Sequence, residues 1–182
     1  MPEVVGEAPG LRLEAVFSTV LMVIIVMGVT GSGKTTVGRR LAESLEWRFH
    51  DADDFHPVAN KAKMHAGIPL TDEDRWPWLR ALRAVIQQAL DDNVGAVMTC
   101  SALKRAYRDV LAGGLSQVRY VHLTGDPSVL AARLAGRSGH FMNPALLDSQ
   151  IATLEAPADA IEVDVALTPD QQVAVIRQAL AL

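Results

Sequence analysis

An apolar run followed directly by a glycine-rich turn constrains this chain more than any other feature. The run, Val23–Met27, is continuous and rich in β-branched residues, which is typical of a strand buried on both faces of a parallel sheet. The turn reads Gly28-Val29-Thr30-Gly31-Ser32-Gly33-Lys34-Thr35 and has the spacing G-x-x-x-x-G-K-[ST]. In this motif the glycines let the backbone wrap closely, so that successive N–H groups point at phosphate oxygens. The sequence therefore predicts a phosphate-binding loop at the end of a buried strand.

The loop also predicts the ligand and its contacts. A helix that begins at Lys34 adds the positive end of its dipole to the phosphate site. Lys34 is expected to reach the β and γ phosphates of ATP, and Thr35 to place its hydroxyl on Mg²⁺. We take residues 28–36, Thr36 included, as the nucleotide-binding segment.

Two other classes of phosphate-loop protein fit the sequence less well. A GTPase would carry an N-K-x-D element, but the Asn60-Lys61 pair continues with Ala62-Lys63 and lies early in the chain. A motor or transport ATPase usually has an apolar strand that ends in an acid, whereas the predicted third strand ends in Met98-Thr99-Cys100-Ser101. A small-molecule kinase needs an acceptor pocket and mobile arginines instead, and the chain offers candidates for both.

Strands and helices alternate along the whole chain. Further strands are predicted at residues 47–50, 95–100, 118–123 and 161–167, and helices separate them. Thr71 is expected to cap one helix, with Asp74 three residues on, and Thr168 to cap the last one. The fold class is therefore α/β, a three-layer α/β/α phosphate-loop NTPase with a five-stranded parallel sheet.

Length and composition limit the remaining possibilities. A chain of 182 residues suggests one domain. Residues 1–21 show no period and are expected to form a poorly ordered extension, with the kinase domain at residues 22–182. The net charge of −4 argues against a nucleic-acid partner, and the apolar segment at residues 15–29 is shorter than the roughly 20 residues that a membrane helix needs. A single cysteine fits a cytoplasmic protein.

An acidic cluster follows the predicted second strand. Asp51 and Asp53 are two residues apart, so on an extended segment their side chains would point to the same side. Carboxyl ends of parallel strands line the active crevice. One carboxylate can hold Mg²⁺ through water and the other can accept the proton of an attacking hydroxyl. We assign Asp51 to the metal and Asp53 to the hydroxyl, although the sequence does not decide which carboxylate does which.

Several motifs, in order, resemble those of the gluconate kinase family, which is related to shikimate kinase and the nucleoside monophosphate kinases. The resemblance covers the chain from about Met22 to the C-terminus and rests on the phosphate loop and on the segments at residues 51–57, 60–64, 67–79, 100–109, 139–142, 149–150 and 153–155. It implies an adenylate-kinase-like fold with a mobile lid, at about residues 133–143. It also implies D-gluconate as acceptor, 6-phosphogluconate as product and a homodimer.

Basic residues complete the expected site. Arg75 is a candidate for the acceptor carboxylate, because a guanidinium can bind both oxygens, and Lys104 and Arg105 follow the third strand at the mouth of the crevice. In the lid, Arg133 and Arg137 are four residues apart and would bring positive charge to the transferred phosphoryl group.

Two histidines and one loop are further candidates. His56 either binds a substrate hydroxyl or serves only the turn before Pro57, and His140 is a lid residue counted among the substrate contacts. By analogy with the fold, adenine is expected beside residues 166–169. Two alternatives to a gluconate kinase stay open: a kinase for another small hydroxy acid such as shikimate, and a nucleotide-binding regulatory module without catalysis.

Overall fold

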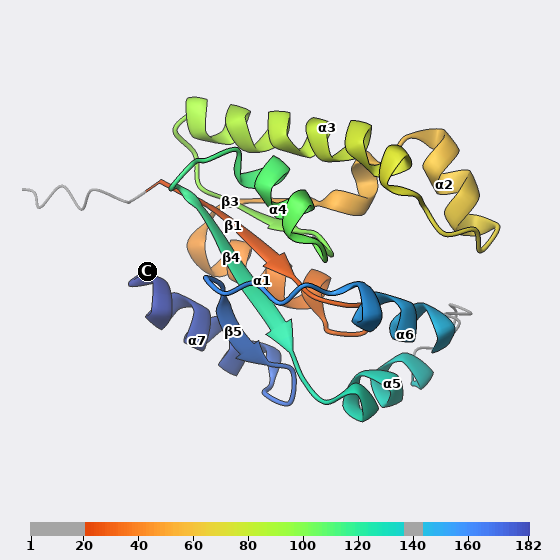
Figure 1. Ribbon diagram of the computed structural model, residues 1–182. Helices are drawn as coiled ribbons and strands as arrows, with labels where there is room; N and C mark the ends of the chain where they lie inside the picture. The colour runs from red at the N-terminus through yellow and green to blue at the C-terminus, as the bar shows by residue number, and fades with distance from the viewer. Residues whose placement is uncertain (1–20, 137–143) are drawn as a thin grey trace, which may run out of the picture.

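The chain folds around one parallel sheet of five strands. The structure, a computed structural model, describes residues 21–136 and 144–182. Strand order in the sheet is β2-β3-β1-β4-β5, so the strand that leads into the phosphate loop is central (Figure 1). The strands are β1 (Val23–Met27), β2 (Arg48–Asp51), β3 (Ala96–Thr99), β4 (Val118–Thr124) and β5 (Ile161–Asp164).

Helices connect the strands and cover both faces of the sheet. They are α1 (Lys34–Leu45), the 3-10 helix η1 (Ala52–Phe55), α2 (Val58–His65), α3 (Asp72–Asp91), α4 (Arg105–Ala112), α5 (Pro127–Ala135), α6 (Pro144–Thr153) and α7 (Pro169–Leu180). In Figure 1, α3 and α4 lie on one side of the sheet and α1 and α7 on the other, while α2, α5 and α6 stand near the end to which the strand arrows point.

The two faces of β1 belong to two separate apolar clusters. Ile24 and Val26 pack with residues of α1, α5 and α7. Val23, Ile25 and Met27 pack with residues of α3 and α4. All five side chains are fully buried, which explains why the strand is a continuous apolar run rather than an alternating one. The core therefore fixes the position from which the phosphate loop begins.

The predicted fold class is confirmed, and each predicted strand is present within a few residues of its expected bounds. The predicted caps are also confirmed: Thr71 with Asp74 and Thr168 with Gln171 each form a complete capping box. One element that the sequence analysis did not anticipate is η1. Its one turn begins directly after β2 and changes how the acidic cluster is arranged.

Parts of two predicted segments lie outside the described residues. The expected extension at residues 1–21 is described only at Leu21, and the expected lid at about residues 133–143 only at residues 133–136. Within the described part of the chain, no helix is both long and apolar enough to cross a membrane.

Candidate active site

The phosphate loop is built on backbone conformations that need glycine. Gly28 has φ 144°, and a Cβ there would lie 2.7 Å from the carbonyl oxygen of Leu123 in β4. Gly31 has φ 80°, and a Cβ there would lie 2.9 Å from Cγ of Leu134 in α5. Both conformations are in the region that residues with a side chain rarely adopt. Glycine at these positions therefore lets the loop fit between β4 and α5.

Side chains at the start of α1 point back to the loop and across to β2. Lys34 Nζ donates to the carbonyl oxygen of Val29, at 2.9 Å, so its charge lies over the loop that precedes it. Thr35 Oγ1 donates to Oδ2 of Asp51, at 3.1 Å. The fold thus brings the last residue of β2 beside the second residue of α1, although β3 lies between β2 and β1 in the sheet.

The Thr35 hydroxyl and the Asp51 carboxylate form a pair of hard oxygen ligands. Mg²⁺ in phosphotransfer sites is held by one or two such protein groups, while phosphate oxygens and water complete its octahedron. The described residues contain no group of three or more His, Cys, Asp or Glu side chains that could enclose a metal by themselves. The two oxygens therefore fit an ion that is bound mainly through the nucleotide.

Asp53 is held by a helical turn, so the expectation of an extended Asp51–Asp53 segment was wrong. Asp51 is the N-cap of η1, and its Oδ1 accepts a hydrogen bond from the backbone N–H of Asp53, at 3.2 Å. Although the Asp53 side chain is 84% exposed, surrounding protein atoms and then the Asp51 charge raise its pKa. A carboxylate with a raised pKa that remains accessible is suited to accept a proton from a hydroxyl.

His56 is a buried neighbour of Asp53. Its ring stacks on the indole of Trp78, with 4.1 Å between ring centroids, and its Nε2 lies 4.0 Å from Oδ1 of Asp53. Burial, and next the charges of Lys61 and Arg75, lower the pKa of His56 to about 4. His56 is therefore a neutral side chain beside Asp53, and its expected contact with a substrate hydroxyl stays a prediction.

Arg75 and Lys104, 29 positions apart, come together around one carboxylate. Lys104 Nζ lies 2.9 and 2.8 Å from the two carboxylate oxygens of Asp72, and Arg75 Nη1 lies 3.7 Å from the same group. Tyr107 donates its hydroxyl to Asp72 and lies under both cations. The hydrogen bond to Lys104, and next the one to Tyr107, lower the pKa of Asp72. We call these four residues the cation cluster.

Arg105 does not join this cluster. Its side chain is 82% exposed and its nearest ion partner is Asp109, one turn further along α4, at 3.9 Å. One of Lys104 and Arg105 was expected to contact the substrate or a phosphate, and for Arg105 that contact stays a prediction. Arg137 and His140, the other two predicted contacts of the lid, lie outside the described residues.

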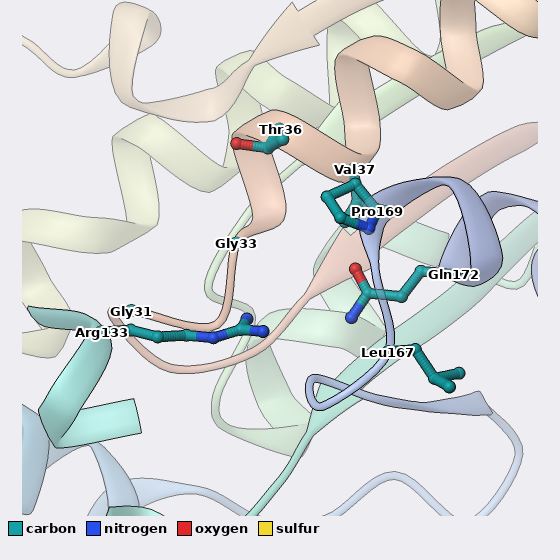
Figure 2. Close-up of a pocket in the computed structure, with 8 residues that line it drawn as sticks. All are labelled: Gly31, Gly33, Thr36, Val37, Arg133, Leu167, Pro169 and Gln172. Carbon is teal, nitrogen blue, oxygen red and sulfur yellow. The ribbon is translucent and has the colours of Figure 1, made fainter. Parts of the chain in front are cut away.

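Arg133 lies on the nucleotide side. It extends from α5 toward the phosphate loop (Figure 2) and donates to the carbonyl oxygen of Val165 after β5. A pocket of about 260 Å³ opens beside it. The residues that line the pocket are Gly31, Gly33, Thr36, Val37, Arg133, Leu167, Pro169 and Gln172. The pocket thus joins the phosphate loop to the segment at residues 166–169, where adenine was expected.

The sequence analysis did not predict three residues that support the site through hydrogen bonds to other residues. Gln150 in α6 accepts a hydrogen bond from the backbone N–H of Thr30, at 2.6 Å. Glu155 accepts one from the backbone N–H of Arg105, at 2.6 Å, and so caps the start of α4. Asn60 was considered in a failed guanine motif. All three residues fall in segments on which the family resemblance rests, but none was assigned a role. Their contacts with Thr30, Arg105 and Asp74 join segments that are distant in the chain, which no local pattern reveals.

The fold and this site define a phosphate-loop kinase. The central strand, the glycine loop, the Thr35–Asp51 pair and an accessible aspartate lie together at the carboxyl end of one parallel sheet, where such folds bind their ligands.

Comparison with known proteins gives the family. Residues 30–164 match the family described as "Shikimate kinase". A probable gluconokinase from Xenopus tropicalis is 47% identical over 172 residues, which cover 85% of this chain and 89% of that protein. A gluconokinase from Gluconobacter oxydans (strain 621H) is 49% identical over 136 residues, with 75% and 76% covered. The crystal structure of a gluconokinase from Sinorhizobium meliloti 1021 superposes with a TM-score of 0.80 at 43% identity and covers 88% of this chain and 91% of that one. The chain therefore belongs to the gluconokinase family of phosphate-loop kinases.

The relation to shikimate kinases is more distant. A shikimate kinase structure from Bacteroides thetaiotaomicron has a TM-score of 0.62 but only 17% identity, while it covers 88% of this chain and 99% of that one. At that identity the likeness concerns the fold alone. The alternative of a shikimate kinase is therefore not favoured.

Proposed function

We propose that this protein transfers the γ-phosphoryl group of ATP to the 6-hydroxyl of D-gluconate and gives 6-phospho-D-gluconate and ADP. The observation that carries the proposal is the Thr35–Asp51 hydrogen bond of 3.1 Å. It holds the acidic end of β2 against the start of α1, so that Asp53 lies near enough to Lys34 for the Lys34 charge to act on its carboxylate. Relatives named gluconokinase identify the acceptor.

On the donor side, the backbone of residues 28–36 binds the phosphates. Lys34 lies over the β and γ phosphates, and Arg133 contacts the nucleotide from the pocket of Figure 2. In the lid, Arg137 brings positive charge close to the transferred phosphoryl group. Mg²⁺, held by Thr35 and Asp51, would neutralise charge that develops between the β and γ phosphates.

On the acceptor side, Asp53 orients the 6-hydroxyl and accepts its proton. The hydroxyl oxygen forms a bond to the γ-phosphorus, and the bond from that phosphorus to the β-phosphate oxygen breaks, so ADP leaves. Little covalent chemistry is asked of the protein, because position and charge supply most of the rate in such transfers.

The cation cluster binds the other end of gluconate. Arg75 and Lys104 share the single charge of Asp72, so the group of three charged side chains keeps a net positive charge. A gluconate carboxylate is the complementary ligand. In the lid, His140 contacts hydroxyls of the sugar acid, while His56, which is buried beside Asp53, acts on the acceptor through Asp53.

Three wider expectations belong to the same proposal. Residues 22–182 form the kinase domain, with residues 133–143 as a lid that closes over ATP. The enzyme acts as a homodimer, which the measured mass of the protein in solution will test. Its place in the cytoplasm stays a prediction from the sequence, based on a single cysteine, and cell fractionation will test it.

A coupled assay of ADP release across a panel of sugar acids and shikimate tests the reaction. We expect ADP formation that depends on gluconate, and ³¹P NMR of the product should place the phosphate on the 6-oxygen. Release of ADP with another acid but not with gluconate would reject the substrate, and no release with any acceptor would favour a regulatory module. Lys34→Ala should abolish turnover, because the charge over the phosphates is lost.

A further inference from the structure

The two ring nitrogens of His56 face two different side chains. Nδ1 lies 3.4 Å from Nδ2 of Asn60, and Nε2 lies 4.0 Å from Oδ1 of Asp53. The ring is 4% exposed and stacks on Trp78 with an interplanar angle of 15°. Because the ring is enclosed in this way, it cannot rotate so that Nδ1 and Nε2 exchange places unless the side chains around Trp78 repack.

The orientation of the Asn60 amide follows from its second contact. One terminal atom of Asn60 lies 2.8 Å from the backbone carbonyl oxygen of Asp74. A carbonyl oxygen only accepts hydrogen bonds, so this terminal atom must be the nitrogen, which carries two hydrogens. The same nitrogen faces Nδ1 of His56. His56 Nδ1 must therefore be an acceptor without a proton.

The remaining proton of His56 must then lie on the other nitrogen. Burial is the main cause that lowers the pKa of this side chain to about 4, and the charges of Lys61 and Arg75 contribute further. The ring is thus neutral at physiological pH and carries a single proton. With Nδ1 occupied as an acceptor, Nε2 carries that proton and lies 4.0 Å from the Asp53 carboxylate.

We propose that Asn60 fixes His56 as the Nε2–H tautomer, which makes Asn60 and His56 positioning residues for Asp53. This inference rests on the proposed function, in which Asp53 accepts the hydroxyl proton. A donor at Nε2 cannot itself take up that proton, so His56 is excluded as the base. Its N–H faces Oδ1 of Asp53 from 4.0 Å, so a small approach of the exposed Asp53 side chain forms the hydrogen bond and leaves Oδ2 available for the acceptor hydroxyl.

A direct measurement of the tautomer tests the proposal. The probe is the full chain, labelled with ¹⁵N and without nucleotide or sugar acid, in a long-range ¹H–¹⁵N NMR experiment at neutral pH. The spectrum of His56→Gln identifies the His56 signals by their loss. We expect an unprotonated Nδ1 and a protonated Nε2, and a protonated Nδ1 would overturn the proposal. Because no acceptor is present, this result does not depend on whether gluconate is the substrate.

A matched pair of substitutions tests the consequence for catalysis. In His56→Gln the terminal amide can place an N–H near the Nε2 position, whereas in His56→Met an uncharged side chain of similar length has no N–H. Both changes lose the stacking on Trp78 alike. A hydrogen bond to a charged group contributes roughly a factor of 10 to 100. Once the 4.0 Å gap to Asp53 closes in the reacting complex, kcat of His56→Met should therefore be at least about 10-fold below that of His56→Gln. The KM for ATP should be the same in both.

Equal kcat values for the two variants would overturn the proposal, since a purely structural His56 would not require an N–H at this position. If His56→Met does not fold, the NMR measurement on the unsubstituted protein still decides the tautomer. In Asn60→Leu the amide constraint is removed, so both tautomers of His56 should appear in the spectrum. Persistence of the pure Nε2–H form in Asn60→Leu would show that Asn60 does not fix it.

Discussion

The donor side and the acceptor side of this site are built in different ways. The phosphate-binding part of the donor side is one continuous segment, residues 28–36, and its shape depends on backbone conformation at a few glycines. The acceptor side combines side chains from η1, α2, α3 and α4, held by hydrogen bonds between them. The donor side should therefore respond most to added side-chain atoms, and the acceptor side to lost polar partners.

The largest expected effect is on the acceptor side, from Asp53→Asn. The amide keeps the size of the side chain but cannot accept a proton, so kcat should fall by roughly 10²- to 10⁴-fold. The KM for ATP should change little, since the phosphate loop is untouched. Steady-state kinetics with varied ATP and varied gluconate give both quantities.

Asp54→Asn is the matched control, because Asp54 is the exposed neighbour in the same turn. It should keep kcat within a few-fold of the unsubstituted enzyme. A loss as large as that of Asp53→Asn would mean that the charge of the turn, rather than one carboxylate, supports the reaction.

Acid should destabilise the acceptor side through His56. The folded-state pKa of His56 is lowered to about 4 from an ordinary value of 6.5, so between these values the unfolded chain binds a proton that the folded chain does not. The free energy of unfolding should therefore decrease as pH falls from about 6.5 to 4, by about 3 kcal/mol in total. Urea unfolding at a series of pH values measures it.

His56→Gln removes the titrating group and should flatten this pH dependence by the same amount. A slope unchanged by the substitution would assign the acid lability to other groups, such as His50 and His122, whose pKa values are also lowered by burial.

On the donor side, Gly31→Ala should weaken ATP binding. The new methyl group would meet Leu134 at 2.9 Å and the backbone would keep an unfavourable φ of 80°. A cost of about 1–3 kcal/mol for such strain corresponds to a rise of roughly 5- to 150-fold in the KM for ATP. The KM for gluconate should stay nearly constant.

Gly114→Ala is the control that separates backbone strain from contact with neighbouring atoms. Gly114 has a similar φ of 77°, but nothing lies within 4 Å of a Cβ built there. Its substitution should lower Tm without a change in the KM for ATP. An equal rise in KM for both variants would contradict a donor side that depends on the local fit of the loop.

The smallest expected effect is that of Asp72→Asn in the cation cluster. Lys104 and Tyr107 lose the carboxylate that holds them, so the KM for gluconate should rise by about 3-fold, a modest change because these groups are partly exposed. Asp109→Asn, beside the exposed Arg105, should leave it unchanged. A change in the KM for ATP instead of the KM for gluconate would mean that the cation cluster belongs to the donor side and not to the acceptor side.

The difference between the donor side and the acceptor side also explains which parts of the site were predictable from the sequence. The phosphate loop and the helix that follows were predicted residue by residue, because their geometry depends on neighbours in the chain. The expectation that Asp51 and Asp53 lie on one extended segment was wrong, since η1 begins directly after Asp51. Arg105 was placed at the mouth of the crevice by its position after β3, yet its side chain turns to solvent.

By itself, the sequence determined the fold class, the phosphate loop, the helix caps and the family. Each of these depends on local spacing or on the order of motifs. Spacing and order are properties of the amino-acid sequence itself and need no knowledge of the folded chain. Only the tertiary structure decided that Thr35 meets Asp51, that Lys104 and Arg75 share Asp72, and that Asn60 faces His56. These contacts join residues 3 to 32 positions apart, and they arise because β3 and the helices on either side of the sheet pack against one core.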